Sequence, residues 1–369
     1  FFKRTLVCAA VATAAMAGSA NAAIELNGQA VQFYGQAAGS LQLNNPEEKD
    51  NNTVVEIESR LGVRGTVEFD NFEPNFIYQM ETGNAWNRGG NNDGLGSFGG
   101  RDTYFGFDFE GVGSLKFGRQ LVAAYNYVDW PHTNPGLGNV FDWHNTIDAS
   151  FQDRANDNIR FDSATWGGWN FQATLSGMDA TNDAMVYSVA TSFTREMFSV
   201  HAGYYGQGEY DTAATTDSWG FDKELPGCSG ETAADKANTA CYGPTGAKEA
   251  GKAGDVSYAI VGGSLFLGDI TLTAAYKAMK NDLTNNDQDA YSATAQYVID
   301  GQWVLKAGYA ATNESKNAKA DDSSTAITAR LGYLLPSTYL YMDIRNYDMK
   351  GDDKSGDTTN VLLGAEYYF

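Results

Sequence analysis

Apolar and polar side chains alternate one by one in a series of short segments along this chain. At the C-terminal end, the apolar face of such a segment carries Val361, Leu363, Ala365, Tyr367 and Phe369. The same alternation recurs in residues 55–69, 270–277, 303–310 and 339–345. A period of two residues is typical of a β-strand with two unlike faces, and about ten residues allow a tilted strand to cross a bilayer. The pattern therefore predicts strands of membrane-spanning length.

The connections between these segments alternate in length. Short ones fall at residues 70–72, 194–196, 299–301 and 336–337, and long ones at 86–100, 121–157, 208–255, 281–289, 313–323 and 350–357. Short turns on one rim and long loops on the other describe an outer-membrane barrel. Counting strands between the breaks gives about 16, a number that encloses an aqueous channel. We expect an all-β fold, one transmembrane antiparallel β-barrel over residues 23–369, and leave the faces of residues 104–109 unassigned.

Residues 1–22 have the three parts of a secretory signal peptide, with basic Lys3 and Arg4, an apolar run and a small-residue ending at Ala22. We therefore expect cleavage and export.

The leader contributes two cations and no acid to the formal net charge of −21, so the mature chain carries −23. This acidic balance argues against nucleic-acid binding, which needs a basic surface. No later stretch approaches about 18 apolar residues, which excludes helical membrane spans.

Two other classes of protein share part of this pattern. A secreted β-sandwich or lectin also alternates, but it would not usually end on an aromatic residue or show alternating loop lengths. An outer-membrane enzyme on a smaller barrel would need a catalytic group on the rim or the wall. No Ser-His-Asp spacing stands out, and only His132 and His144 lie in the long loop. We therefore expect a channel with no catalytic residue, no metal ligand and no cofactor.

Residues 121–157 form a loop of unusual composition. Loops of this length are usually functional or disordered. The aromatic residues in this one are Tyr125, Tyr127, Trp130, Phe141, Trp143 and Phe151. Large aromatic side chains are costly to expose to water, so we expect the loop to fold back against the barrel wall as an inward-folded constriction. On the wall, alternation places Glu58, Arg60 and Arg64 on one polar face.

Four passages of the chain have a distinctive order and spacing. They are residues 31–36, residues 59–65, Arg101 with residues 113–119, and the final residues 367–369. Together they resemble the trimeric general porins of Gram-negative bacteria over essentially the whole mature length. The resemblance implies a homotrimer in outer-membrane lipid and lipopolysaccharide, recognition of Phe369 by the outer-membrane assembly machinery, and passive diffusion of small solutes.

The resemblance also implies positions for the charges at the constriction. Arg60, Arg101 and Arg154 match the basic cluster on the barrel wall of these porins. Gln36 stands where relatives often carry Lys, and Gly136 stands where they carry an acid across the pore. The opposed-charge constriction of the family is therefore only partly matched. The candidates for the missing acid are Asp129, Asp142 and Asp148.

Two tryptophans on the constriction loop indicate a particular group within this family. Trp130 and Trp143 each follow an aspartate, and with the nearby charges they resemble the chitoporins, porins of marine bacteria that take up chitin oligosaccharides. Aromatic rings stack on the apolar faces of pyranose rings, while Asp and Arg hydrogen-bond hydroxyl and N-acetyl groups. The candidate binding residues are Trp130, Trp143, Asp129, Asp142, Asp153, Arg154, Arg60, Arg101, Arg64 and Glu58. The alternative is a non-specific, weakly cation-preferring pore, in which the tryptophans only pack the loop against the wall.

Cys228 and Cys241 form an even pair in a polar, Gly-rich part of the exported chain. In an oxidising compartment we expect a disulfide between them, stapling an extracellular loop; two free thiols are the alternative. Intact-mass measurement after thiol alkylation should show no added mass unless the protein is reduced first. Two alkylated thiols without reduction would contradict the disulfide.

Overall fold

The computed structural model describes residues 23–47, 49–84, 97–179, 181–213, 219–221, 242–244, 250–351 and 356–369. The expected leader, residues 1–22, and the Cys228–Cys241 pair lie outside the described residues. In the described part, no helix has the length and apolar character needed to cross a membrane.

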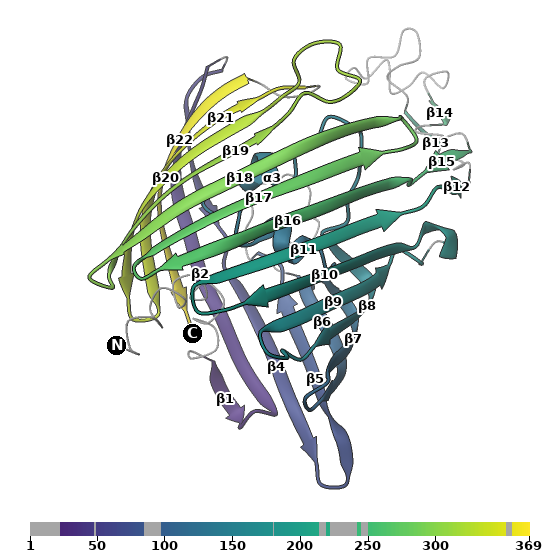
Figure 1. The fold of residues 1–369 in the computed structure, drawn as a ribbon, viewed down its shortest axis with the longest axis vertical. Coiled ribbons are helices and arrows are strands. Elements are labelled where there is room, and N and C mark those ends of the chain that lie inside the picture. The colour runs from purple at the N-terminus through teal and green to yellow at the C-terminus, as the bar shows by residue number, and fades with distance from the viewer. Residues whose placement is uncertain are drawn as a thin grey trace.

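Within the described residues, 16 antiparallel strands form a closed barrel (Figure 1), as the sequence predicted. These strands are β2 (Val31–Pro46), β4 (Arg60–Phe69), β5 (Phe72–Thr82), β6 (Phe98–Phe109), β7 (Gly113–Leu121), β8 (Arg154–Ser163), β9 (Trp169–Ser176), β10 (Val186–Thr194), β11 (Phe198–Gln207), β16 (Val256–Leu267), β17 (Ile270–Asn281), β18 (Asn286–Ile299), β19 (Trp303–Thr312), β20 (Thr325–Leu335), β21 (Thr338–Met349) and β22 (Gly356–Tyr368). The other strands are β1 (Ile24–Asn27), β3 (Asn52–Ile57), β12 (Tyr210–Thr212), β13 (Trp219–Phe221), β14 (Tyr242–Pro244) and β15 (Gly251–Ala253). The helical segments are α2 (Tyr125–Asp129), α3 (Gly138–Phe141) and the 3-10 helix η1 (Asn182–Ala184).

The barrel closes between β2 and β22. Residues 36–46 of β2 pair with β22, while the other edge of β2 pairs with β3 and β4. The pairing continues past Gln36 and Tyr368. The Gly35 N–H donates to the Phe369 carbonyl at 2.7 Å, and the Phe369 N–H donates to the Gly35 carbonyl at 3.1 Å. Lipid offers backbone groups no hydrogen-bond partner, so a spanning sheet must leave no open edge. The seam between β2 and β22 is therefore closed by backbone hydrogen bonds up to and including Phe369.

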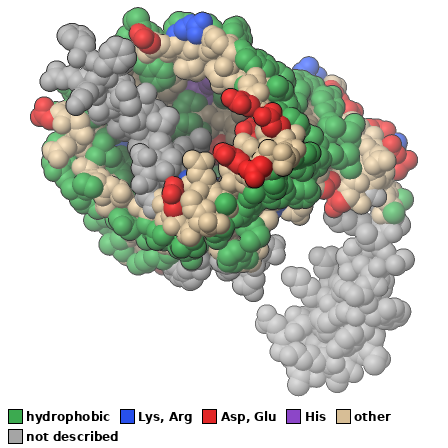
Figure 2. Space-filling view, turned by 90° about the horizontal axis from the view of Figure 1, so that it is seen from below, with side chains coloured by type: hydrophobic (Ala, Val, Ile, Leu, Met, Phe, Trp, Pro, Cys, Tyr) green, Lys and Arg blue, Asp and Glu red, His purple; other side chains and the backbone are tan. Residues whose placement is uncertain are grey.

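The two faces of the strands differ as the alternation predicts. On β17, Leu272 is exposed, whereas Thr273 and Lys277 are buried on the opposite face. On β6, whose faces the sequence left open, Phe105 and Phe109 are exposed. Apolar side chains cover the outer wall of the hollow barrel, and carboxylates gather at its rim (Figure 2). Because lipid-facing apolar residues alternate with lumen residues in such barrels, the face with Leu272 lies toward lipid and the face with Lys277 toward the channel.

The structure divides one expected strand. Residues 55–69 belong to β3 and β4, which both pair with β2 and are separated at Glu58 and Ser59. At this break the Ala38 N–H donates to the Ser59 hydroxyl at 3.0 Å, so a side chain takes the place of a backbone acceptor. Glu58 therefore lies between two strands, and its position on the polar face does not follow from alternation alone.

The loop between β7 and β8, residues 122–153, packs on the lumen side of distant strands. α2 contacts β11 and β16, and α3 contacts β18, β19 and β20. The fully buried side chains between loop and wall include Val128, Leu137, Val140, Phe141 and Ile147. β8 begins at Arg154, so the last residues of the loop expected at 121–157 belong to the wall.

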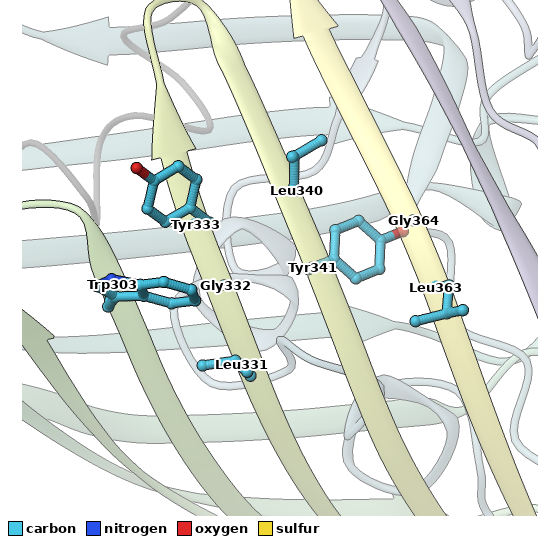
Figure 3. Close-up of a pocket in the computed structure, with 8 residues that line it drawn as sticks. All are labelled: Trp303, Leu331, Gly332, Tyr333, Leu340, Tyr341, Leu363 and Gly364. Atoms are coloured by element: carbon cyan, nitrogen blue, oxygen red, sulfur yellow. The ribbon is translucent and has the colours of Figure 1, made fainter.

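An apolar groove lies on the outer wall across β19 to β22 (Figure 3). Its lining residues are Trp303, Leu331, Gly332, Tyr333, Leu340, Tyr341, Leu363 and Gly364. The Tyr341 ring lies beside Gly364, where a Cβ atom would lie 2.2 Å from it, and it is on the channel side of the wall, because the Arg330 guanidinium lies 4.2 Å from its centroid. The described residues that line this groove include no charged side chain, so the groove does not suit a hydrophilic solute.

A methyl group at Gly35 would disturb the closing seam. A Cβ atom there would lie 2.5 Å from the Phe369 ring and 2.9 Å from the Leu61 side chain. We expect Gly35→Ala to lower the free energy of unfolding by about 1–3 kcal/mol, the usual cost of overpacking, in urea unfolding of the refolded barrel. Gly208→Ala is the control, because Gly208 has nothing within 4 Å of its Cβ position. Equal stability of the two variants would contradict this account of the seam.

Candidate functional site

Side chains of the barrel wall hold the loop by its backbone. The bonds to loop carbonyls come from Ser292 Oγ to His132 (2.6 Å), Tyr347 OH to Gly136 (2.9 Å), Lys277 Nζ to Asp142 (2.9 Å) and Asn281 Nδ2 to Ile147 (2.8 Å). The donors lie on β17, β18 and β21, strands far from β7 and β8 in the sequence. Because these bonds hold backbone atoms, they fix the path of the loop without occupying polar groups of its side chains.

The two histidines that an enzyme could use as bases are both buried. His132 Nε2 lies 2.9 Å from His201 Nε2 of β11, and Tyr127 stacks on the His201 ring at 4.5 Å. Burial lowers the pKa of His132 to about 3, so this ring stays neutral at physiological pH. His144 is 5% exposed and shares a hydrogen bond with Ser324 Oγ. Both loop histidines therefore act as anchors within the packed loop.

The two loop tryptophans have different surroundings. The Trp143 side chain is 64% exposed and hydrogen-bonds the Asp153 carboxylate. Trp130 is partly buried, and Lys306 Nζ of β19 lies 5.7 Å from the centroid of its ring. Trp143 thus offers an open aromatic face, whereas the face of Trp130 is shared with an ammonium group.

The three predicted loop acids are unequally accessible. Asp142 is 7% exposed and accepts a hydrogen bond from Tyr125 OH at 2.8 Å, so it is bound within the loop. Asp129 and Asp153 are partly buried. Burial raises the pKa of all three carboxyls, that of Asp153 to about 6. Of the three, Asp153 is the one that hydrogen-bonds the exposed Trp143 side chain.

Arg101 and Arg154 of the wall are each paired with an acid that sequence reasoning did not select. Arg101 Nε lies 2.6 Å from Glu81, and Arg154 Nε lies 2.6 Å from Asp102. Both arginines also interact electrostatically with Asp129 of the loop. The structure thus brings Arg101, Arg154 and Asp129 together.

Arg60 and Arg64 extend this basic cluster along β4. Arg60 interacts with Arg101 and Asp129, and its buried Nε has no hydrogen-bond partner among the described residues. Arg64 donates to Gln32 at 3.2 Å, and its guanidinium lies 4.9 Å from the centroid of the Tyr34 ring. Arg60 therefore keeps an unused donor, while Arg64 is held against the wall.

Some predicted residues lie apart from this cluster, and some important ones were missed. Glu58 is exposed at the break between β3 and β4, and Asp148 is exposed on the loop with a φ of 57°. Lys277 and Lys306 were not singled out, although alternation places both on the lumen faces of their strands. In the described part of the chain, no three His, Cys, Asp or Glu side chains are grouped to hold a metal ion.

Comparison with known proteins agrees with this geometry. The sequence matches the Gram-negative porin family over residues 8–369. It is 32% identical, over 391 residues, to a protein from Vibrio furnissii named chitoporin, with 100% of this chain and 99% of that protein covered.

Solved structures share the fold at low sequence identity. An anion-selective porin from Comamonas acidovorans has a TM-score of 0.65 and 17% identity, and OmpT of Vibrio cholerae in its trimer form has 0.62 and 19%. Each comparison covers 92% of this chain and 99% of the other. With a closed barrel, a charged lumen and a family match over nearly its whole length, the chain belongs to the Gram-negative porins and forms a channel through the outer membrane.

Proposed function

We propose that this porin conducts chitin oligosaccharides and binds them transiently at the constriction loop. The observation that carries the proposal is Trp143, whose side chain is 64% exposed beside the Asp153 carboxylate. A pyranose ring fits this combination, because its apolar face stacks on an indole while its hydroxyl groups donate to a carboxylate. The relative named chitoporin, which aligns with the whole chain at 32% identity, supports chitin fragments over other sugars.

The wall arginines would hold the polar rim of the same sugar. Each guanidinium has five N–H donors, so Arg101 and Arg154 retain free donors after bonding Glu81 and Asp102. These donors suit hydroxyl oxygens and the carbonyl of an N-acetyl group. Stacking from the loop and hydrogen bonds from the wall would orient the chain along the pore. Conduction requires each such contact to be weak enough for release.

We also propose that three barrels assemble as a homotrimer, each with its own pore. OmpT, which shares the fold, is described in a trimer form. Outer-membrane lipid and lipopolysaccharide would contact the apolar outer face, and recognition of Phe369 by the assembly machinery would precede closure of the seam with Gly35.

The second candidate is a non-specific, weakly cation-preferring diffusion pore. Asp129 and Asp153 favour it, because both are partly buried acids of the constriction loop. In that function Trp143 would only support the loop, and its removal would leave sugar block unchanged.

Removal of the exposed indole separates the two functions. A stacking contact is worth about 1 kcal/mol, so Trp143→Ala should weaken chitohexaose block of the single-channel current roughly fivefold without closing the pore. The control is Trp303→Ala, which removes an indole from the lipid-facing groove. Wild-type current that chitohexaose does not interrupt, or block that survives Trp143→Ala unchanged, would contradict sugar binding at this position.

The charge of Asp153 should make ion selectivity depend on pH. Burial raises the pKa of Asp153 from 3.8 to about 6, so protonation on acidification removes a negative charge from the constriction. The preference for potassium over chloride, measured from reversal potentials, should fall between pH 7.5 and pH 5 with a midpoint near 6. The same shift affects stability. Because the pKa of Asp153 is higher in the folded state than its ordinary value of 3.8, the protonated carboxyl is the form that the folded state prefers. Its contribution to the free energy of unfolding is fully present below about pH 4 and is lost as pH rises through about 6.

Two asparagine variants test that assignment. Asp153→Asn should abolish the pH step, whereas Asp148→Asn, at an exposed acid of the same loop, should keep it. A step of full size in Asp153→Asn would refute the assignment.

A further inference from the structure

Lys306 is a lumen cation without an acidic partner. Its Nζ atom lies 5.7 Å from the centroid of the Trp130 ring. Among the described residues it makes no hydrogen bond or ion pair, and the charged group that acts on it is Arg330. An ammonium with no counter-ion of its own keeps its full capacity to bind an anion that enters the channel.

Arg330 and Arg345 extend this cation into a basic strip across β19, β20 and β21. Lys306 and Arg330 are direct cross-strand partners, as are Arg330 and Asp343. Asp343 accepts bonds from Arg330 at 2.6 and 2.8 Å and from Arg345 at 2.5 Å. One fully buried carboxylate therefore serves two guanidinium groups, and the strip of three cations retains a net positive charge.

The constriction loop does not neutralise this strip. Gly136 faces it, and a Cβ atom there would lie 2.5 Å from Arg345 Cδ, so a side chain has no room. Asp129 of the loop acts instead on the arginines of the opposite cluster. Glu58 acts on Arg345 only from beyond ion-pair distance.

From these observations we infer that Trp130 and Lys306 form a subsite for a sugar acid, a pyranose that carries a carboxylate, and that the basic strip beside them favours its negative charge. The Lys306 ammonium lies over the Trp130 indole face. A sugar acid satisfies both groups together, because its ring takes the aromatic face and its carboxylate takes the ammonium, which moves on a flexible stem. This activity goes beyond the neutral oligosaccharides proposed above and uses a different part of the wall.

The test is single-channel block by trigalacturonate, with neutral maltotriose of equal length as the reference sugar. A hydrogen bond to a charged group contributes enough for about a tenfold change in affinity. Wild-type porin should bind trigalacturonate about tenfold more tightly than maltotriose, and Lys306→Gln should remove that difference. Lys306→Arg should restore it to within about twofold. Lys280→Gln is the control, because it removes the same charge from the exposed outer face of β17.

Four outcomes would overturn the inference. One is equal block of wild type by the two trisaccharides. Another is an equal effect of Lys306→Gln and Lys280→Gln. A third is a loss of chitohexaose block in Lys306→Gln as large as the loss for trigalacturonate, which would mean that Lys306 only positions Trp130. The last is displacement of trigalacturonate by equimolar phosphate, which would mean that the site binds anions without recognising the sugar ring.

Discussion

Every backbone hydrogen bond of a sheet in lipid has to be made within the protein, and the rest of this structure depends on that constraint. It forbids an open edge, so the chain must return to its first long strand. The last carbonyl and N–H of Phe369 therefore bond to Gly35. Closure of 16 strands in turn creates a hollow interior, and it forces adjacent residues of each strand to face either lipid or water.

A hollow of this size discriminates poorly between small solutes until something narrows it. We propose that the loop between β7 and β8 does so, because wall side chains such as Lys277, Ser292 and Tyr347 bind its carbonyls. The apolar side of the loop, including Phe141, is buried against the wall. The same packing leaves Trp143 exposed, because its neighbours Asp142 and His144 take the buried positions.

The charges of the lumen divide into two groups with different balance. Around Arg101 and Arg154, wall acids and Asp129 offset the positive charge. Around Lys306 and Arg330, Asp343 is the one acid in ion-pair contact among the described residues. The charge of the lumen wall is therefore nearly balanced around Arg101 and Arg154 and positive around Lys306 and Arg330.

The sequence by itself determined the barrel, because strand faces depend on a local period of two and turn positions on local composition. It also selected Arg60, Arg101 and Arg154, through their resemblance to known strand signatures, and in the structure these three arginines lie near Asp129. It could not separate Trp143 from Trp130, because each follows an aspartate, or Asp153 from Asp142, because local sequence does not report the burial of a loop residue. Their exposure is decided by contacts with strands more than a hundred residues away, such as that of Lys277 with Asp142. The proposed role of Lys306 likewise depends on closure of the sheet, which brings it against Trp130 of the loop and away from any acid among the described residues.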